Sequence, residues 1–315
     1  MKPPKFWYRK NAGLLSLLLR PLSWIYAAGT ARLLRNGVRQ KLPIPVICVG
    51  NINIGGTGKT PTVIALVEML KVMGHKPAVL SRGYGGTAEG PEQVDPNKQT
   101  ADQVGDEPIL IASFCDAWVS KDRLKGAEAI LKSDADILIL DDGLQNPDLA
   151  YDLTLTVVDA ERGFGNGAVI PSGPLREPIQ SGLSRTDHLI SIGGALSDYE
   201  AIIGHLKPVE TGLDWSDLHV VAFAGIGRPE KFFATLKRLG ATLEATHAFD
   251  DHAPYSDTIL QRLEREAFTK NAMLITTEKD AARLPVEWRQ QIMSLPVRLQ
   301  FEDSEKVKAV LKALF

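Results

Sequence analysis

The length, composition and charge of this chain are those of an ordinary globular protein. It has 315 residues, of which 44% are hydrophobic and 23% charged, and its formal net charge is −2 at pH 7. This composition excludes a disordered or low-complexity chain, and the length allows two domains. The two cysteines, Cys48 and Cys115, lack the spacing of a metal site and make a disulfide framework unexpected, as is typical of a reducing compartment.

The first 42 residues combine positive charge with large apolar side chains. They contain no acid, and their basic residues are Lys2, Lys5, Arg9, Lys10, Arg20, Arg32, Arg35, Arg39 and Lys41. Because Arg20 and Pro21 interrupt the leucine-rich run, it falls short of the ~20 residues that a spanning helix needs. The segment therefore predicts a helix or broken helix lying in a membrane interface, with a helix packed on its own domain as the alternative. Leucines dilute the basic residues, which disfavours nucleic-acid binding.

Residues 44–61, IPVICVGNINIGGTGKTP, have the order of a phosphate-binding loop: a strand at 46–49, a turn of small residues and a helix. The small residues of the turn are Gly55, Gly56, Thr57 and Gly58. Backbone N–H groups of such a turn converge on an oligophosphate, Lys59 reaches the β- and γ-phosphates, and Thr60 ligates Mg²⁺. Asn53 replaces the first glycine of the general pattern, a mild departure because Asn tolerates positive φ. A glycine-rich turn with an incidental lysine is the alternative.

Two further segments carry polar residues toward the ligand-binding edge of an α/β sheet. A strand at 76–80 ends in the sequence SRGYGG, which places Arg82 and Tyr84 at the carboxyl end of a strand. A helix is then expected from Gly105 to about residue 117, with Asp106 at its N-cap. Capping alone is the alternative explanation for Asp106.

Paired carboxylates end the next apolar strand. A helix at 119–132, which carries Arg123, precedes the run DILILDD at 136–142. This run is typical of a buried parallel strand whose carboxyl end faces a ligand. Asp141 or Asp142 would then hold Mg²⁺ or its waters, as P-loop chemistry requires. A turn or helix cap is the alternative.

The second half of the chain restarts the alternation of strands and helices. Before it, a loop rich in Gly and Pro at 163–178 ends in Arg176 and Glu177, which favours an active-site wall over a surface ion pair. After a junction at 211–215, the pattern predicts a smaller α/β unit with its own core. In this unit His252 follows two carboxylates, where it either orients a general base or belongs to the N-cap cluster of the next helix.

These segments, in this order, resemble the tetraacyldisaccharide 4′-kinase family. The matching motifs are the basic apolar N-terminus, VGNINIGGTGKTP, SRGYGG, VGDEP, DDGLQ, PSGPLREP, FDDH and TTEKDAARL. The resemblance implies transfer of the ATP γ-phosphate to the 4′-hydroxyl of a tetraacylated glucosamine disaccharide 1-phosphate in lipid A biosynthesis. It also implies ATP and Mg²⁺ as cofactors, the acylated lipid and the membrane surface as partners, and no nucleic acid or obligate protein partner.

The family resemblance implies a P-loop NTPase-type parallel sheet flanked by helices, with a second, smaller C-terminal α/β domain and an N-terminal membrane-interface helix. We expect a membrane-associating segment at 1–40, a kinase domain at 41–212 and the smaller domain at 213–315. Such a protein would lie at the cytoplasmic face of the bacterial inner membrane, as a peripheral or monotopic protein.

The resemblance also implies roles for individual residues. Lys59 and Thr60 would bind the phosphates and Mg²⁺, and Asp141 and Asp142 would serve the metal. Asp106 would accept the proton of the sugar hydroxyl, with His252 as its partner. The other residues implied around the phosphate, metal and substrate are Glu107, Arg123, Gln145, Arg176 and Glu177. Those implied at the lipid-sugar site are Tyr84 and Arg82.

Two other classes of function stay open from the sequence. The run IGGTGKT at 54–60 also resembles the loop of membrane-associated partitioning ATPases, which are nucleotide switches and carry lysine where this chain has Ile54. ATP turnover that needs a protein partner or DNA and yields no phosphorylated lipid would favour such a switch. A lipid-binding protein that keeps ATP only for stability is the third class, and tight lipid binding without phosphate transfer would favour it.

Overall fold

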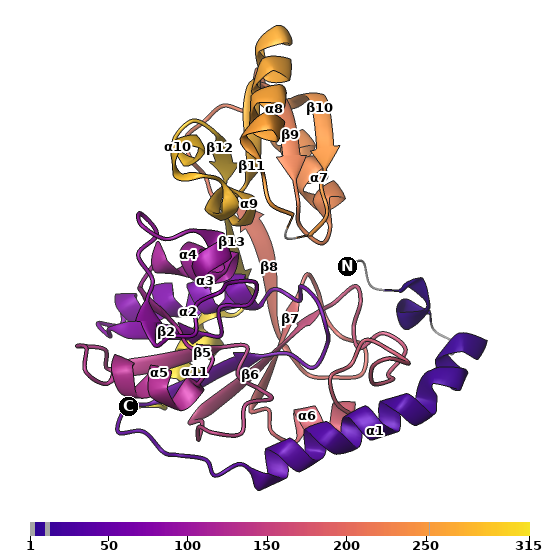
Figure 1. The fold of residues 1–315 in the computed structure, drawn as a ribbon, viewed down its shortest axis with the longest axis vertical. Coiled ribbons are helices and arrows are strands. Elements are labelled where there is room, and N and C mark those ends of the chain that lie inside the picture. Colours follow the sequence, from indigo (N-terminus) through magenta and orange to yellow (C-terminus); the bar gives the residue numbers. More distant parts are fainter. Residues whose placement is uncertain (1–3, 10–12, 252) are drawn as a thin grey trace.

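The computed structural model describes residues 4–9, 13–251 and 253–315. They form two α/β units, one above the other in Figure 1, with a long N-terminal helix beside the lower unit. The larger unit is built on a nine-stranded sheet and the smaller on a four-stranded sheet. The expected α/β fold with a second, smaller α/β unit is thereby confirmed.

The larger sheet is parallel through its centre. Its strand order is β13-β8-β7-β6-β1-β5-β2-β4-β3, and β13 and β3 pair antiparallel at its two edges. Its strands are β1 (Val46–Gly50), β2 (Pro77–Ser81), β3 (Glu92–Gln93), β4 (Asp116–Val119), β5 (Ile137–Asp141), β6 (Leu153–Asp159), β7 (His188–Ile192), β8 (Ile202–Pro208) and β13 (Val297–Phe301). Strands β1, β2 and β5 are buried along their whole length, as expected of strands covered by helices on both faces.

The helices of the larger unit are α2 (Lys59–Val72), α3 (Ala101–Val104), α4 (Asp106–Ala112), α5 (Arg123–Ile130), α6 (Ile179–Leu183) and α11 (Ser304–Lys312). Three of them, α2, α5 and α6, connect parallel strands of the sheet. Apolar residues of α2 pack on β1 in the largest core cluster. The chain leaves β1 through α2 toward β2, on one side of β1. The connection after β5 leads to β6, on the other side of β1, so the connections run in opposite directions from the carboxyl end of β1. Ligands of open α/β sheets bind at such an edge.

Among the strands of the larger sheet that differ from the expectation are β4 and β8. β4 lies within a stretch that was expected to be helical, so α4 ends at Ala112 and α5 begins only at Arg123. β8 was not expected at all. Both are short or carry polar residues, and both depend on pairing with strands distant in sequence, which a local pattern does not reveal.

The smaller unit is a parallel sheet with the order β10-β9-β11-β12 and helices on both faces. Its elements are β9 (His219–Ala224), α7 (Pro229–Leu239), β10 (Thr242–Ala248), α8 (Asp257–Thr269), β11 (Met273–Thr277), α9 (Glu278–Arg283), α10 (Val286–Arg289) and β12 (Met293–Leu295). Alternate residues of β9 enter two different core clusters, Val221 and Phe223 on one face and Val220 and Ala222 on the other. The sheet is therefore covered on both faces, as the alternating pattern predicted.

The last strand and helix of the chain return to the larger unit. We expected residues 213–315 to form one domain, but β13 pairs with β8, and Val307 and Leu311 of α11 lie in the core of the larger unit. The physical reason is edge pairing: β8 offers an open edge, and β13 covers it. The elements of the smaller sheet, from β9 to β12, are thus inserted between two strands of the larger one.

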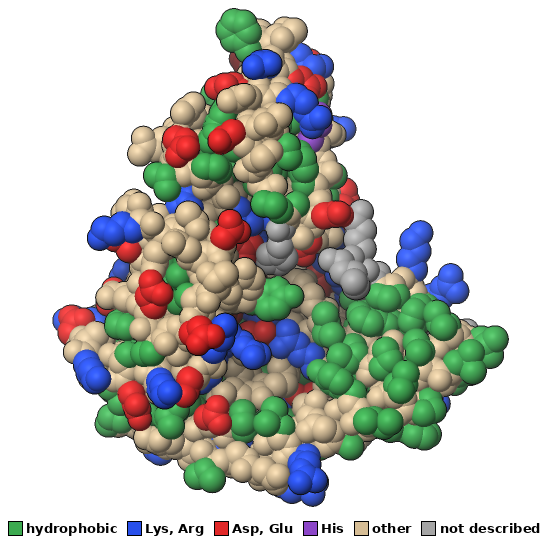
Figure 2. Space-filling model, viewed as in Figure 1, with side chains coloured by type: hydrophobic (Ala, Val, Ile, Leu, Met, Phe, Trp, Pro, Cys, Tyr) green, Lys and Arg blue, Asp and Glu red, His purple; other side chains and the backbone are tan. Residues whose placement is uncertain are grey.

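Helix α1 (Leu14–Asn36) is a single helix of 23 residues that continues through Pro21. Of the two expected forms, a helix or a broken helix, the structure has the helix, because proline removes one backbone hydrogen bond and the turns on both sides remain in place. By length and composition alone α1 is apolar enough to cross a membrane, and 11% of its most apolar window is buried. Figure 2 shows hydrophobic side chains gathered over α1 at the lower right. The exposed ones are Leu14, Leu15, Leu17, Leu18, Leu22, Trp24, Ile25, Tyr26 and Leu33.

Serines attach α1 to the loop at 163–178. Ser16 and Ser23 are the buried residues of the helix. The Ser16 hydroxyl donates to the carbonyl of Ser172 over 2.9 Å, and the Ser23 hydroxyl donates to the carbonyl of Val169 over 2.7 Å. The backbone N–H of Ser172 donates back to the Ser23 hydroxyl at 3.1 Å. Helix α1 thus contacts the loop at 163–178 through Ser16 and Ser23, and its large apolar side chains face outward.

Candidate active site

The glycine-rich turn between β1 and α2 has the geometry of a phosphate-binding loop. Gly55 and Gly58 take φ values of +103° and +96°, which residues with a side chain adopt rarely. Gly58 is also the N-cap of α2, so the backbone enters the helix directly at Lys59. A Cβ atom at Gly55 or Gly56 would meet nothing within 4 Å, which leaves open space over the turn for a ligand.

Asn53 connects the phosphate-binding loop to the loop at 163–178. Among the described residues the non-glycine positions with positive φ are Asp142 and Asn271, so the tolerance of Asn for positive φ is not used at position 53. Its side-chain amide donates instead to the carbonyl of Gly163 at 2.9 Å, and the N–H of Ile54 donates to the carbonyl of Pro174 at 2.8 Å. Asparagine replaces glycine here because the position needs a hydrogen-bond donor.

The paired carboxylates at the end of β5 lie beside this loop. The Lys59 ammonium is 3.7 Å from Asp142 Oδ1, and Arg176 donates to both oxygens of Asp142 at 2.9 and 3.0 Å. Burial alone would raise the pKa of Asp142, but the charges of Lys59 and Arg176 outweigh it and hold the pKa below its usual value. Asp142 therefore stays ionised and lies between Lys59 of the phosphate-binding loop and Arg176 of the loop at 163–178.

Asp141 has a different environment, which fits a cation. It is 1% exposed, its Oδ2 accepts a 3.4 Å hydrogen bond from Ser81, and its Oδ1 has no partner among the described residues. Burial, and then the negative charge of Glu107, raises the pKa of Asp141 to about 7. An unpartnered buried carboxylate oxygen near the helix that starts at Lys59-Thr60 is suited to Mg²⁺, which uses one or two carboxylates and completes its shell with phosphate oxygens and water.

The buried charge of Asp141 should cost stability in the absence of ligands. Its folded-state pKa of about 7 lies above the value in an unfolded chain, so the folded state holds the extra proton at acid pH and loses this advantage as pH rises toward 7. We expect Asp141→Asn to raise the melting temperature of the ligand-free protein by roughly 2–4 °C near pH 8, and by less near pH 5. Thermal unfolding at both pH values measures this. An equal gain at both, or a loss near pH 8, would contradict it.

Arg176 and Glu177 do not form the surface ion pair that was the alternative. The N–H of Arg176 donates to the carbonyl of Ile52 at 2.7 Å, which fixes the loop at 163–178 beside β1. Glu177 is 1% exposed and receives hydrogen bonds from Arg185 to both oxygens at 2.8 and 2.9 Å. Gln145 bridges the two residues, donating to Glu177 at 3.0 Å and accepting from Arg176 at 3.1 Å. Arg185 had no role in the sequence analysis, because only tertiary packing brings it here.

Arg123 and the loop after β2 complete the edge of the sheet. Arg123 is 4% exposed and donates to the Asp141 carbonyl at 3.0 Å, and one of its terminal nitrogens has no partner among the described residues. Burial lowers the pKa of Arg123. Tyr84 is 78% exposed and Arg82 is exposed, so both lie at the rim. Figure 2 shows basic side chains gathered in this region beside the hydrophobic surface of α1.

Asp106 begins α4 but is not its cap. Gly105 is the N-cap, with φ +90° and ψ 154°, and a Cβ atom there would lie 2.8 Å from the carbonyl of Tyr84. The expected N-cap role of Asp106 is therefore wrong, because the turn requires glycine at the position before it. Asp106 is 4% exposed, and Lys279 and Arg283 of the smaller unit lie 3.9 and 3.8 Å from its Oδ2.

The rest of this cluster extends the contact between the two units. Lys279 also pairs with Glu107 at 3.3 Å, and the charges of Glu107 and then Asp106 overcome the effect of burial and raise the pKa of Lys279. Neither Lys279 nor Arg283 was given a role from the sequence, although both lie in the motif TTEKDAARL. His252, the predicted partner of Asp106, lies outside the described residues.

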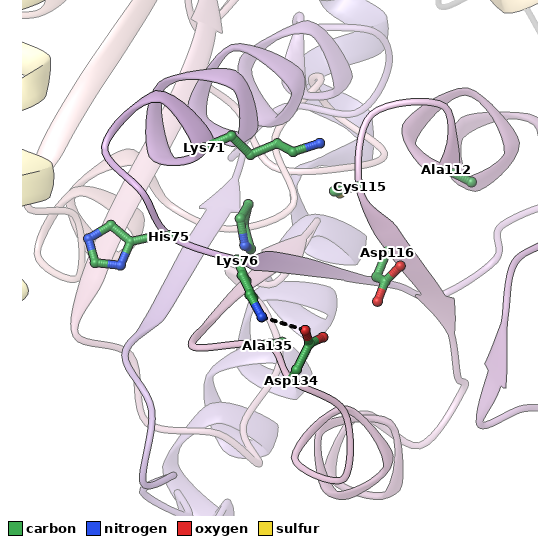
Figure 3. A pocket seen from close by; sticks show the side chains of 9 residues that line it. Lys71, His75, Lys76, Ala112, Cys115, Asp116, Asp134 and Ala135 are labelled. Atoms are coloured by element: carbon green, nitrogen blue, oxygen red, sulfur yellow. Dashed lines mark hydrogen bonds and ion pairs between the residues drawn. The ribbon is translucent and has the colours of Figure 1, made fainter.

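A cavity of about 330 Å³ lies at the opposite edge of the sheet, at the amino ends of β2, β4 and β5. Figure 3 shows Lys71, Lys76, Asp116 and Asp134 around it. Lys76 pairs with Asp134 at 2.7 Å, and Lys71 donates to the carbonyl of Phe114 at 2.7 Å. None of the predicted site residues lines this cavity, so it is separate from the phosphate-binding loop.

Comparisons with known proteins agree on one family. Residues 15–315 match the family model LpxK, described as tetraacyldisaccharide-1-P 4′-kinase. Proteins named tetraacyldisaccharide 4′-kinase from Jannaschia sp. and Dinoroseobacter shibae are 53% and 51% identical, over 96% and 100% of this chain and 96% and 98% of their own lengths. The crystal structure of LpxK from Aquifex aeolicus in complex with ATP is 28% identical, with a TM-score of 0.78, over 96% of this chain and all of that one.

Proposed function

We propose that this chain, which belongs to the tetraacyldisaccharide-1-phosphate 4′-kinase family, transfers the γ-phosphate of ATP to the 4′-hydroxyl of a tetraacylated glucosamine disaccharide 1-phosphate. The observation that carries the proposal is the cluster at one sheet edge, where the Lys59 ammonium lies 3.7 Å from Asp142 and Asp141 has an unpartnered buried oxygen. The alternative of a partitioning-ATPase switch lacks support, because the family match spans nearly the whole chain.

The phosphate side of the site is proposed to hold ATP and Mg²⁺. Backbone N–H groups at 55–58 would surround the β-phosphate, and Lys59 would contact the β- and γ-phosphates. Thr60 and Asp141 would hold Mg²⁺, with Asp142 beside them. The chemistry that Mg²⁺ supplies when bound is neutralisation of phosphate charge. Because Glu177 is fully engaged by Arg185, its proposed contribution to the metal is indirect, through Gln145 and Arg176.

The acceptor side is proposed to use Asp106 as the base. The nucleophile is an alcohol, whose proton has to leave only as the bond to phosphorus forms, and a carboxylate suffices for this. Asp106 is 4% exposed and lies where α9 of the smaller unit contacts α4. Tyr84 and Arg82, on the exposed rim, are proposed to contact the sugar and its phosphate.

The test of the proposed function is transfer of label to lipid. The protein would be incubated with γ-labelled ATP, Mg²⁺ and detergent-dispersed disaccharide 1-phosphate, and the lipid separated by chromatography. We expect labelled 4′-phosphate on the lipid, and no label with a 4′-deoxy acceptor. Label that reaches only water or only the protein would overturn the proposal.

The outer surface of α1 is proposed to bind the cytoplasmic face of the inner membrane. Acyl chains of the substrate would then stay in the bilayer while its headgroup meets the site. Leu18 and Ile25 are 67% and 70% exposed on this surface. Replacing both with Glu should weaken sedimentation with phosphatidylglycerol-containing vesicles by about tenfold or more, because charge opposes insertion of the apolar surface.

A matched control for the membrane experiment lies on the smaller unit. Phe268 of α8 is 87% exposed, so Phe268→Glu makes the same kind of change away from α1. We expect it to sediment like the unmodified protein. Unchanged sedimentation of the α1 double variant would remove the membrane role of this surface.

A further inference from the structure

Helix α9 carries two cations from the smaller unit to the proposed base. Lys279 and Arg283 are four residues apart, hence on one face of the helix, and α9 packs against α4. The Lys279 ammonium lies 3.9 Å and the Arg283 Nε 3.8 Å from Asp106 Oδ2. Two cations from one unit therefore meet a single buried carboxylate of the other. This arrangement differs from an ordinary surface ion pair, in which one cation meets one carboxylate in water and stabilises the protein little.

Arg283 is held rigidly by its other nitrogens. Its side chain is 5% exposed, it donates to the carbonyls of Gly225 at 2.7 Å and Ala253 at 3.3 Å, and it pairs with Asp280. Asp280 is itself fully buried and accepts from the N–H of Gly225 at 3.0 Å and the hydroxyl of Tyr255 at 2.7 Å. This network fixes the plane of the guanidinium, so the direction of its Nε is fixed as well.

The Nε of Arg283 is the part of this network left without a hydrogen-bond partner in the described structure. A buried donor in that condition is destabilising, because it has given up its hydrogen bond to water without gaining another. Hydrogen bonds between nitrogen and oxygen span about 2.7–3.2 Å, so a movement of somewhat under 1 Å between α9 and α4 would join Nε to Asp106. The two units meet at this point, and such a small approach is within the range of movements between packed units.

We infer that Lys279 and Arg283 are positioning residues for Asp106: they hold its carboxylate in place and in its charged form, so that the base is complete only when the two units are together. The inference rests on the proposed function, because it takes Asp106 as the base. Among the described residues, the ionisable groups around this carboxylate are Glu107 on α4, Lys279 and Arg283 on α9, and Asp251, whose charge acts on Lys279. If one cation is removed, the negative charge of Glu107, which disfavours the charged form of Asp106, is offset by one positive charge fewer.

The test is the pH dependence of kcat for lipid phosphorylation between about pH 5 and pH 9. In Lys279→Met we expect the acidic limb to move to higher pH by roughly one unit or more, since a nearby cation lowers a carboxyl pKa by about 1–3 units. The KM for ATP should change less than about twofold, because the described ion pairs of Lys279 are to Asp106 and Glu107 on α4, outside the glycine-rich turn proposed to hold the phosphates. Lys279→Arg, which restores the charge, should return the limb to its original place.

Two further variants separate this inference from a purely structural role. Arg283→Lys keeps the charge but loses the fixed Nε, so kcat should fall about tenfold while the acidic limb stays near its original position. Lys237→Met removes an exposed lysine of α7 in the same unit and should leave the pH profile unchanged. Melting curves show whether each variant is folded before its kinetics are compared.

The outcomes distinguish the inference from the function on which it rests. If Asp106→Asn retains full activity, the assignment of the base fails, and the inference with it. If Asp106→Asn loses activity but folded Lys279→Met keeps both the kcat and the acidic limb of the unmodified protein, the inference alone is overturned. Loss of ATP binding in Lys279→Met would also overturn it, because the role would then be structural.

Discussion

Asp106→Asn should lower kcat for lipid phosphorylation by roughly 10²–10⁴-fold, the range for loss of a general base. Asparagine keeps the size and polarity of the side chain but accepts no proton. The dissociation constant for ATP should change less than about threefold, because the proposed phosphate ligands lie on the P-loop and at the end of β5. Steady-state label transfer to lipid, together with equilibrium binding of ATP, measures the two effects separately.

A neighbouring carboxylate provides the matched control for Asp106. Asp102 lies on α3, is exposed, and precedes Asp106 by four residues. Asp102→Asn makes the same chemical change outside the site and should keep kcat within about twofold of the unmodified protein. Turnover by Asp106→Asn at the rate of this control would exclude Asp106 as the base.

Lys59→Met should have the second large effect. The Lys59 side chain is 12% exposed, its ammonium lies 3.7 Å from Asp142 Oδ1, and its removal takes away the cation proposed for the β- and γ-phosphates. Loss of one such electrostatic contact lowers kcat by roughly 10²–10³-fold. ATP affinity should fall as well, because the same contact is present before transfer. Methionine keeps the length of the side chain, so the loss is mainly one of charge.

The same helix supplies the control for Lys59. Lys71 lies in the last turn of α2 and donates to the carbonyl of Phe114 at 2.7 Å, far along the helix from the glycine-rich turn. Lys71→Met removes an equal charge from α2 and should leave label transfer nearly unchanged. Comparable losses in both variants would indicate a general effect on the helix, and full activity of Lys59→Met would exclude the proposed phosphate contact.

Much of the site follows from short-range sequence patterns. A buried strand, a glycine-rich turn and a helix beginning Lys59-Thr60 are contiguous, and the apolar run up to Asp141 is a fully buried strand, as expected, with Asp142 directly after it. Parallel pairing of β1 with β5 then brings these two segments to one edge. Local patterns suffice here because each motif lies within one strand-to-loop connection, and the pairing of the strands then brings the motifs together.

What the sequence could not supply comes from contacts between distant segments. Arg185 reaches Glu177 across a short helix, and Lys279 and Arg283 reach Asp106 across more than 170 positions of chain. β8 and β13 are recognisable as neighbours only once their pairing is known. Such contacts depend on tertiary packing, within the larger unit for Arg185 and β13 and between the two units for Lys279 and Arg283, and no periodicity in the chain encodes that packing.

The γ-phosphate is proposed to pass in one step from ATP bound at Lys59 to the acceptor hydroxyl beside Asp106. Asp106 receives the proton of that hydroxyl and never the phosphate. The stereochemical course at the γ-phosphorus tests this most directly, with ATP made chiral at that phosphate by oxygen isotopes. A single in-line transfer predicts inversion of configuration in the 4′-phosphate of the lipid. Retention would contradict the account, because it requires two successive displacements through a phosphorylated side chain.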